Sequence, residues 1–377
     1  MSEQKHILFL VSSLNEGGAE RVASLLCDYW VENNYKVTLM PTYSGRGETF
    51  HPINDSVQIS FLSDILGSTK NNLWNRIKRF LLLRKFILDK KPDLIISFLA
   101  QVNVTAILSS LGTGIPVIVS ERTYPPQYQI GFIWTTLRKI LYSRASAIVM
   151  QTSQGLDWVT TQIPRGKGYV IPNPILYPVP DSDPFIETKS VVDDEKKICL
   201  AVGRFVEYKH FKEIVIAFSG VAEEFRNWEL VFLGDGSERE NLEKEAEYRG
   251  LQKRIHFPGR AGNLDDWYKR ANLFVLSSRF EGFPNALLEA RAYGVPCISV
   301  DCDTGPRDII SSGDNGLLIP QGSTENLIQA MKSLMQDHDL AKTYGRSARK
   351  ATENFSIEAI GLKWDSLIYS CLKDPEE

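Results

Sequence analysis

The sequence lacks any long apolar run, and no segment approaches the roughly 18 consecutive apolar residues of a membrane-spanning helix. The apolar stretch at residues 7–11 is too short for the hydrophobic region of a signal peptide. Paired cysteines are also missing, because the five present are scattered and form no CxxC motif; they are Cys27, Cys199, Cys297, Cys302 and Cys371. This usage is typical of reduced, mostly buried thiols, so we expect a cytoplasmic protein.

Low-complexity tracts and a strong net charge are absent too. With 43% hydrophobic and 24% charged residues the chain is of globular type, and 377 residues predict two domains. The net charge of −3 is uneven: residues 1–180 hold 18 Lys and Arg against 12 Asp and Glu, whereas the remainder holds 25 against 34. This asymmetry suggests an anionic surface or ligand for the first half, although ordinary solvated faces explain it equally well. We expect no nucleic acid as a partner.

Short apolar runs alternate with helical patterns along both halves of the chain. This alternation predicts parallel sheets covered on both faces. The strands expected in the first half are residues 5–11, 36–40, 93–97, 116–120, 147–150 and 169–171. Those expected in the second half are residues 197–202, 229–233, 255–257, 273–276 and 297–300. The fold class is therefore α/β, with two Rossmann-like, doubly wound domains.

A segment with five prolines, residues 171–184, separates the two halves. Proline neither continues a helix nor donates to a sheet, so we expect a domain boundary here. The predicted domains are residues 1–175 and 176–355, followed by a final helical segment at 356–377. Two such domains would place a cleft between them, where the carboxyl ends of their strands face each other.

The strongest local signal is the run from Glu281 to Glu289, EGFPNALLE. A strand ends at residue 276, a Gly/Pro turn follows, and a helix is expected to open near Asn285. Amides at a helix N-terminus suit a diphosphate, and carboxylates at either end of the run could hold hydroxyl groups. Two glutamates at this spacing could equally be a helix-start acid and a surface acid.

Three glycine-containing loops follow expected strands. Gly203 and Arg204, with Lys209 further on, could bind phosphate, although an exposed Lys and Arg near a turn is the plainer interpretation. Gly17 and Gly18 occupy the place of a Rossmann phosphate loop, but the full GxGxxG is absent. Gly234 repeats this situation after the strand at residues 229–233, and each glycine could serve only a tight turn.

Taken together, these pieces resemble glycosyltransferase family 4 over nearly the whole chain and in the right order. The glycine loop Gly17-Gly18-Ala19-Glu20 comes first, and Gly203-Arg204 with Lys209 follows in the second half. The most specific part is the segment 280–290, and the motifs that complete it are Gly294-Val-Pro296, Thr304-Gly-Pro-Arg307 and Asn315-Gly-Leu-Leu318.

The resemblance implies a GT-B fold and metal-independent transfer from a nucleotide sugar with retention of configuration. Arg204 and Lys209 would stabilise the leaving diphosphate, and Glu281 would hold hydroxyls of the donor sugar; these are the expected catalytic residues. Glu289 would hold the ribose. The remaining donor-binding residues implied are Gly203, Phe283, Pro284, Asn285, Ala286, Leu287 and Gly234. Residues 1–175 would form the acceptor domain, residues 176–355 the donor domain, and the last helix would pack back on the first domain.

One departure concerns a histidine that many family members carry after the strand at residues 116–120. This chain has Arg122 there, and a guanidinium is no base at neutral pH. We expect Arg122, with Gly17 and Gly18, to bind phosphate or an acidic acceptor group; a structural role for Arg122 or its neighbour Glu121 stays open. Asp301-Cys-Asp303 matches a metal-binding DxD pattern, but we expect an ordinary loop and no metal or other cofactor.

Residues 72–91 form a helix-like stretch with seven basic residues and one acid. Such a helix can lie on anionic headgroups or grip a lipid diphosphate, although an ordinary amphipathic helix packed on the sheet also fits. A weaker basic-aromatic stretch covers residues 132–144. We expect peripheral contact with the inner face of a membrane. By resemblance, the acceptor is a saccharide on a polyprenyl diphosphate used in surface polysaccharide or glycoprotein assembly.

The expected activity is transfer of a hexose or N-acetylhexosamine from a nucleotide sugar, UDP-linked by preference. Two alternatives stay open: a nucleotide-sugar epimerase on the same fold, and a non-catalytic carbohydrate-binding relative. The first half offers no clear set of acid and base groups for an epimerase. The motif residues retained in the second half argue against loss of catalysis, and the missing fingerprint argues against a redox Rossmann enzyme.

Overall fold

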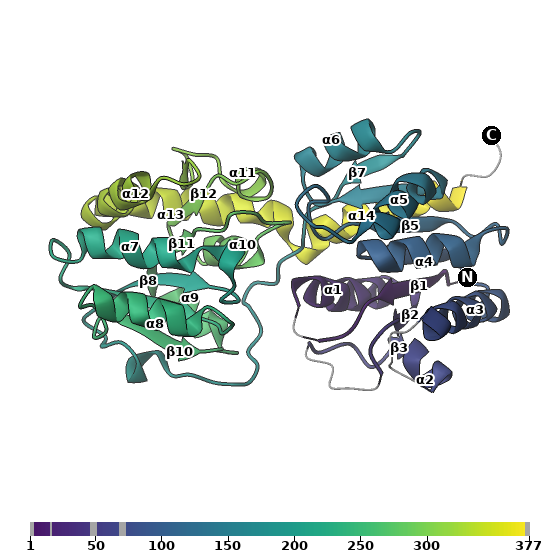
Figure 1. The fold of residues 1–377 in the computed structure, drawn as a ribbon, viewed down its shortest axis with the longest axis horizontal. Helices are drawn as coiled ribbons and strands as arrows, with labels where there is room; N and C mark the ends of the chain where they lie inside the picture. The colour runs from purple at the N-terminus through teal and green to yellow at the C-terminus, as the bar shows by residue number, and fades with distance from the viewer. Residues whose placement is uncertain (1–3, 16, 46–50, 68–72, 374–377) are drawn as a thin grey trace. The chain divides into compact units, whose positions relative to one another are not determined.

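The computed structural model describes residues 4–15, 17–45, 51–67 and 73–373. The chain divides into two compact units. The first unit consists of Met1–Pro174 together with Ile357–Glu377, and the second consists of Ile175–Ser356. Each unit is an α/β body built on one parallel sheet (Figure 1).

The sheet of the first unit has seven parallel strands in the order β3-β2-β1-β4-β5-β6-β7. Six of them coincide with expected strands, and the two-residue β3 was not predicted. The strands are β1 (His6–Val11), β2 (Lys36–Pro41), β3 (Gln58–Ile59), β4 (Leu94–Phe98), β5 (Val117–Ser120), β6 (Ala147–Met150) and β7 (Gly168–Val170).

Strand β1 shows why these segments are apolar throughout. All six of its residues are buried. Ile7 and Phe9 belong to the hydrophobic cluster on one face of the sheet, whereas Leu8 and Leu10 belong to the cluster on the other face. Because side chains alternate along a strand, a sheet covered on both faces needs apolar residues at every position.

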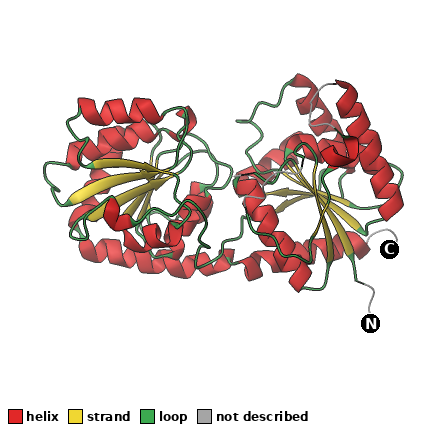
Figure 2. Ribbon diagram, turned by 90° about the horizontal axis from the view of Figure 1, so that it is seen from below, coloured by secondary structure: helices red, strands yellow, loops and turns green. Residues whose placement is uncertain are grey.

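Helices flank both faces of this sheet (Figure 2). They are α1 (Gly18–Glu32), α2 (Leu62–Leu66), α3 (Leu73–Lys90), α4 (Ala100–Ser110), α5 (Phe132–Leu141), η1 (Tyr142–Arg144), α6 (Ser153–Gln162) and the C-terminal α14 (Ile357–Lys373). The buried ring of Trp364 in α14 packs edge-on against Trp30 of α1, with 5.9 Å between ring centroids. The hydroxyl of Tyr29 donates to Asp365 at 2.7 Å. The final helix is thus part of the first unit, and residues 374–377 of the predicted C-terminal segment lie outside the described residues.

The second unit carries a six-stranded parallel sheet in the order β10-β9-β8-β11-β12-β13. Its strands are β8 (Lys197–Val202), β9 (Trp228–Leu233), β10 (Ile255–Gly259), β11 (Ala271–Leu276), β12 (Cys297–Val300) and β13 (Leu317–Ile319). Its helices are η2 (Thr188–Ser190), η3 (Glu207–Lys209), α7 (Phe211–Val221), α8 (Arg239–Tyr248), α9 (Leu264–Arg270), α10 (Asn285–Ala292), α11 (Pro306–Ile309), α12 (Thr324–Gln336), α13 (His338–Thr352) and η4 (Glu353–Phe355).

The proline-rich segment packs against the second unit along part of its length. Ile175 and Val179 are buried in the core of the second unit. The amide of Val179 donates to the hydroxyl of Tyr293 at 2.8 Å, and the amide of Gly262 donates to the carbonyl of Pro184 at 2.6 Å. Proline favours an extended backbone and has no amide donor. The segment therefore bonds to the second unit through its remaining amides and its carbonyls.

Both strand orders reverse once near the middle of the sheet. In the first unit the reversal lies between β1 and β4, and in the second unit between β8 and β11. Loops that leave neighbouring strands in opposite directions open a crevice at their carboxyl ends, where open α/β sheets bind ligands. The two reversals define where a site is expected in each unit.

Among the described residues, no helix is long and apolar enough to cross a membrane. All five cysteines lie among the described residues; they are buried thiols, and none is in a disulfide. Burial raises the pKa of the Cys302 thiol, which lies beside the candidate site, to about 12.

Candidate functional site

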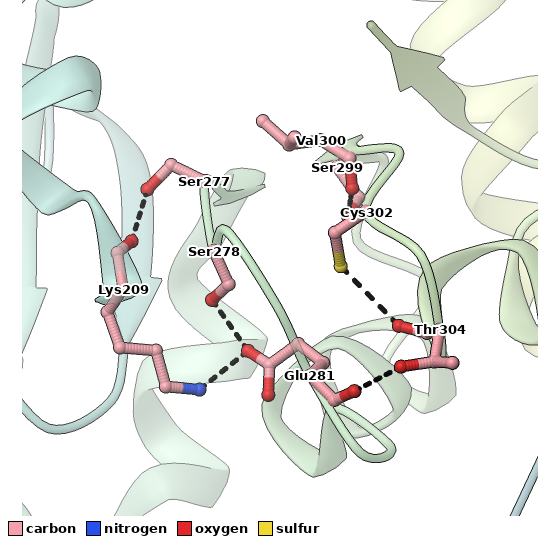
Figure 3. A network of polar contacts seen from close by, with 8 residues as sticks. All are labelled: Lys209, Ser277, Ser278, Glu281, Ser299, Val300, Cys302 and Thr304. Atoms are coloured by element: carbon pink, nitrogen blue, oxygen red, sulfur yellow. Dashed lines mark hydrogen bonds and ion pairs between the residues drawn. The ribbon is translucent and has the colours of Figure 1, made fainter. Parts of the chain in front are cut away.

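The loops that follow β8 and β11 meet at the reversal of the second sheet. Lys209 ends η3 on the first loop, and Glu281 lies on the second. The Nζ atom of Lys209 is 2.6 Å from Oε1 of Glu281 (Figure 3). The side chains are 18% and 9% exposed, so the pair is largely shielded but still open to the surface.

Backbone contacts fix the two loops against each other. The amide of Arg279 donates to the carbonyl of Tyr208 at 2.8 Å, and the hydroxyl of Ser277 donates to the carbonyl of Lys209 at 2.8 Å. The rings of Tyr208 and Phe280 stack with 4.6 Å between centroids. The position of Lys209 is therefore fixed by hydrogen bonds to the main chain of its loop as well as by its ion pair with Glu281.

The carboxylate of Glu281 is held through one oxygen only. The hydroxyl of buried Ser278 donates to Oε1 at 2.6 Å, the same oxygen that Lys209 contacts (Figure 3). No described residue hydrogen-bonds to Oε2, and that atom is not fully buried. The site thus holds a fixed carboxylate with one oxygen directed to solvent.

The loop after β12 supports the Glu281 loop from the other side. The buried hydroxyl of Thr304 donates to the carbonyl of Glu281, and the Cys302 thiol contacts the carbonyl of Thr304 at 3.4 Å (Figure 3). Gly305 has a φ of +96°, and a Cβ there would lie 2.7 Å from Cδ of Pro284. Only glycine permits both this backbone and this close approach.

The residues predicted to bind phosphate in the second unit lie on two loops, one after β8 and one after β9. Gly203 and Gly234 follow the adjacent strands β8 and β9, and a Cβ on Gly234 would lie 1.9 Å from the carbonyl oxygen of Gly203. Gly234 therefore allows the two strand ends to approach. The side chain of Arg204 is exposed and makes no hydrogen bond or ion pair with a described residue.

Helix α10 carries most of the remaining predicted donor-binding residues. Phe283, Pro284 and Leu287 are buried, so their side chains belong to the core, while Asn285 and Ala286 are half-buried at the helix start. Pro284 is the N-cap residue and provides no side-chain cap to the amides that follow. These amides stay oriented along the helix axis at its positive end.

Glu289 lies one turn further along α10 and is buried. Its Oε2 accepts a hydrogen bond at 2.8 Å from the hydroxyl of Tyr268 in α9. The ring of Tyr268 stacks on Tyr293, whose hydroxyl donates to Asp265 at 2.6 Å. The Glu289 carboxylate is thus held by Tyr268, whose ring packs on Tyr293, and Tyr293 is in turn held by its hydrogen bond to Asp265.

In the first unit, Gly17 is the N-cap residue of α1 and Gly18 is its first residue. The side chain of Glu20 folds back over this start: a Cβ on Gly17 would lie 1.9 Å from its Oε2, and its Oε1 accepts from the Ser13 hydroxyl at 2.9 Å. A carboxylate of the chain itself therefore occupies the N-terminal end of α1. Residue 16, in the same loop, lies outside the described residues.

Arg122 is buried, only 7% exposed, at the end of β5. Its guanidinium lies 4.2 Å from the centroid of the Phe98 ring and donates to the side chains of Ser120 and Asn173. Its Nε has no acceptor among the described residues. Burial lowers the pKa of Arg122 to about 9, with Glu20 partly offsetting this effect.

Glu121, in contrast, is part of the core. Tyr142 donates to its Oε1 at 2.6 Å, and the buried guanidinium of Arg138 lies 3.6 Å away. Tyr142 in turn accepts from Asn103 at 2.9 Å. Burial raises the pKa of Glu121 despite these partners. These contacts explain why Glu121 is buried, without a role in binding or catalysis.

The DxD pattern is also explained by local structure. Asp301 accepts two hydrogen bonds from Arg307, each 2.8 Å long. Both carboxylate oxygens of Asp301 are engaged in this bidentate pair. Within the described part of the chain, no group of three His, Cys, Asp or Glu side chains is placed to hold a metal ion.

Helix α3 covers most of the predicted basic segment; Asn72 lies outside the described residues. Its cations have different environments. Arg84 donates to the carbonyls of Ser109 and Leu111 at the end of α4, and Arg79 is buried with its guanidinium 5.2 Å from the centroid of the Tyr43 ring. The other cations of α3 are exposed, as is Lys91 directly after the helix; they are Arg76, Lys78, Lys85 and Lys90.

Sequence patterns did not identify Ser277, Ser278 or Tyr268, and they gave no particular role to Thr304 within its motif. Hydroxyl residues after a strand are ordinary, and Tyr268 lies 21 positions before Glu289. The one available signal was position, since Ser277 and Ser278 directly follow β11, next to the sheet reversal.

Two parallel sheets, each with one reversal of its strand order, are the architecture of the GT-B fold. Two family models match the chain: Glycosyltransferase Family 4 over residues 16–175 and Glycosyl transferases group 1 over residues 182–351. The chain belongs to glycosyltransferase family 4, and it is a glycosyltransferase.

Full-length relatives agree with this assignment. One is the GalNAc-alpha-(1->4)-GalNAc-alpha-(1->3)-diNAcBac-PP-undecaprenol alpha-1,4-N-acetyl-D-galactosaminyltransferase of Campylobacter jejuni, 27% identical across 96% of this chain and 98% of its own. Another is the amylovoran biosynthesis glycosyltransferase AmsD of Erwinia amylovora, 26% identical across 96% and 99%.

Solved structures agree on the fold. A glycosyltransferase from Rickettsia africae is similar over 99% of this chain and 100% of its own, with a TM-score of 0.82 at 16% identity. Anabaena Alr3699/HepE in complex with UDP covers 97% of this chain and 100% of its own, with a TM-score of 0.79 at 16% identity.

Proposed function

We propose that this protein is a retaining glycosyltransferase that moves a hexose or N-acetylhexosamine from a UDP-sugar to a saccharide acceptor. The observation that carries the proposal is the pair of Lys209 and Glu281, held at 2.6 Å at the sheet reversal of the second unit. A cation for a diphosphate and a carboxylate for sugar hydroxyls stand side by side there. UDP as the nucleotide is supported by the Anabaena fold neighbour, which was crystallised with it.

In this proposal the diphosphate lies between the start of α10 and the two cations. The exposed guanidinium of Arg204 and the ammonium of Lys209 neutralise charge that grows on the leaving diphosphate as the glycosidic bond breaks. The N-terminal amides of α10, from Phe283 onward, add further donors. Gly203 and Gly234 let the phosphate approach the backbone.

The two glutamates hold the neutral ends of the donor. The solvent-directed Oε2 of Glu281 accepts from hydroxyls of the sugar, while Oε1 stays with Lys209 and Ser278. Glu289, fixed by Tyr268, accepts from the ribose hydroxyls. A departing diphosphate oxygen takes the proton of the incoming hydroxyl, in a front-side displacement that needs no histidine base.

The first unit supplies the acceptor side. The positive end of α1 at Gly17 and Gly18 and the buried guanidinium of Arg122 form an anion-attracting pair at the reversal of its sheet. Glu20 covers this end of the helix in the free protein and must yield to an acidic group on the acceptor saccharide. The acceptor proposed is a saccharide on a polyprenyl diphosphate, as the name of the Campylobacter jejuni relative describes for that enzyme.

Contact with the inner face of a membrane follows from the same assignment. The exposed cations of α3 attract anionic headgroups, each contributing about 1 kcal/mol near a charged surface. Residues 132–144 add the exposed side chains of Phe132 and Ile133 on α5. Surface polysaccharide or glycoprotein assembly is the process in which such an enzyme would act.

The test is release of UDP from a panel of UDP-sugars by the full chain, with Glu281→Ala and Lys209→Ala as site variants. Lys212→Ala is the matched control, because Lys212 is an exposed cation on the adjacent helix α7. Loss of turnover in both site variants, with folding intact, supports the proposal. Full activity in both would reject the site. Conversion of a UDP-sugar into its epimer without acceptor would favour the epimerase alternative.

A further inference from the structure

A cavity lies in the first unit, beside the end of β2. It is a cavity of about 220 Å³ among α2, α3, α4, α5 and the end of β2. Its walls are mainly apolar and aromatic and include Tyr43, Leu62, Phe80, Leu108, Trp134 and Leu137. The cavity reaches the surface, because Ile77 and Arg76 of α3 line it and both are exposed.

The two helices that line this cavity also carry large apolar side chains exposed to water. Trp74 of α3 is 74% exposed, and Phe132 and Ile133 of α5 are 85% and 70% exposed. Helix α3 packs against α2 and α4, and α5 packs against α4 (Figure 1). Apolar gatherings of this kind mark interaction sites, and well-packed interiors leave few voids of this size.

Two arginines line the cavity together with its apolar walls. Arg76 is exposed, whereas Arg79 is buried. Arg79 is held by its stacking on Tyr43, which also lines the cavity. An apolar pocket that also presents guanidinium groups matches an amphiphile with a hydrocarbon chain and a phosphate head.

We propose that this cavity binds the first part of the isoprenoid chain of the lipid-linked acceptor, with Arg76 and Arg79 against its diphosphate. This inference rests on the proposed function, in which the acceptor joins a chain, a diphosphate and a saccharide in that order. An apolar cavity of about 150 Å³ accepts benzene, so 220 Å³ takes roughly nine carbon atoms, close to two isoprene units. In this arrangement the first unit binds one lipid molecule in its cavity, in addition to contacting the bilayer surface.

The experiment is calorimetric titration of the full chain with geranyl diphosphate, which carries two isoprene units. Inorganic diphosphate tests the head alone, geraniol the chain alone, and decyl phosphate an unbranched chain. Geranyl diphosphate is expected to bind at least tenfold more tightly than each of these three. Equal binding of inorganic diphosphate or of decyl phosphate would overturn the assignment.

Two matched substitutions on α4 test the location. Leu108→Trp fills the cavity, whereas Leu111→Trp makes the same change at the exposed end of the helix, outside the lining. The first should weaken geranyl diphosphate at least tenfold and the second should leave it unchanged. If Leu108→Trp does not fold, Leu108→Ala enlarges the cavity and should shift preference toward farnesyl diphosphate. Unchanged affinities in the folded variants would refute the cavity.

The head-group contact has its own pair of variants. Arg76→Gln should weaken geranyl diphosphate about tenfold and leave geraniol unaffected, because it removes a charged hydrogen bond. Lys90→Gln, an exposed cation outside the lining, should do neither. UDP titration of the same variants separates the two proposals: UDP binding without geranyl diphosphate binding rejects only the cavity, and the reverse rejects the donor site.

Discussion

Substitution of Ser278 tests how the donor-site carboxylate is positioned. Ser278→Ala removes the hydroxyl that donates to Oε1 of Glu281 at 2.6 Å, at a position where only 1% of the serine is exposed. A hydrogen bond to a charged group contributes about 1.5–3 kcal/mol. Lys209 remains on the same oxygen at 2.6 Å, so the lower end applies. Since 1.36 kcal/mol is tenfold in rate, the expected loss is about tenfold in kcat.

The assay is UDP release from the UDP-sugar that the wild-type protein turns over fastest, with kcat and KM measured separately. Ser299→Ala is the matched control, because Ser299 is equally buried and donates only to the carbonyl of Val300 (Figure 3). Both variants lose one buried hydroxyl and should lose similar thermal stability. Only Ser278→Ala should lose turnover.

Two results would refute this reasoning. Equal kcat in the two serine variants would mean that Oε1 needs no second donor. A fall in thermal stability of Ser278→Ala without any change in kcat would mean that the serine supports only the loop.

Three further predictions concern other parts of the molecule. Gly234→Ala should destabilise the protein by about 2–4 kcal/mol, because its Cβ would meet the carbonyl of Gly203 at 1.9 Å; thermal denaturation measures this, and an unchanged Tm contradicts it. Tyr268→Phe should reduce the preference for UDP over 2′-deoxy-UDP by loosening Glu289, whereas a purely structural tyrosine would weaken both nucleotides equally. Burial lowers the pKa of His6 in the folded protein. As the pH falls below 6.5 the unfolded chain therefore binds a proton before the folded protein does. The free energy of unfolding should then decrease, by at most about 1.4 kcal/mol per pH unit, until the pH passes the lowered pKa. Denaturant titrations of wild-type and His6→Gln between pH 7 and 4.5 check this, since the variant should lose less stability on acidification.

The sequence predicted the fold well because its strands are fully buried and their apolar runs are continuous. Strand β1 is the clearest example, with both faces covered. Strands β3 and β13 were not predicted, because two or three residues are too few to show a period; β7 is equally short but adjoins the apolar Ile171, which extended its run. The proline-rich segment was expected to mark a domain boundary, but its composition does not show that Ile175 and Val179 are buried in the core of the second unit.

The candidate site was predicted unevenly for a physical reason. Glu281, Lys209 and Gly203 follow strands in recognisable motifs, so the sequence singled them out as candidates. The structure brings Lys209 and Glu281 together, and their roles stay predictions. Partners that act through geometry could not be singled out: the proximity of Ser278 to the carboxylate, or of Tyr268 to Glu289, depends on loop paths and on helix packing across the unit.

We propose that the second unit holds a nucleotide sugar between Lys209, Glu281 and Glu289. Saturation-transfer NMR of the full chain with UDP, GDP and ADP and their sugars, in buffer containing a chelator, is the most direct test of this binding. We expect selective transfer to UDP and one UDP-sugar, with strong ribose signals that weaken in Glu289→Ala and persist in Leu362→Ala, an exposed position on α14. Equal nucleotide signals in both variants, or transfer to no nucleotide at all, would contradict it.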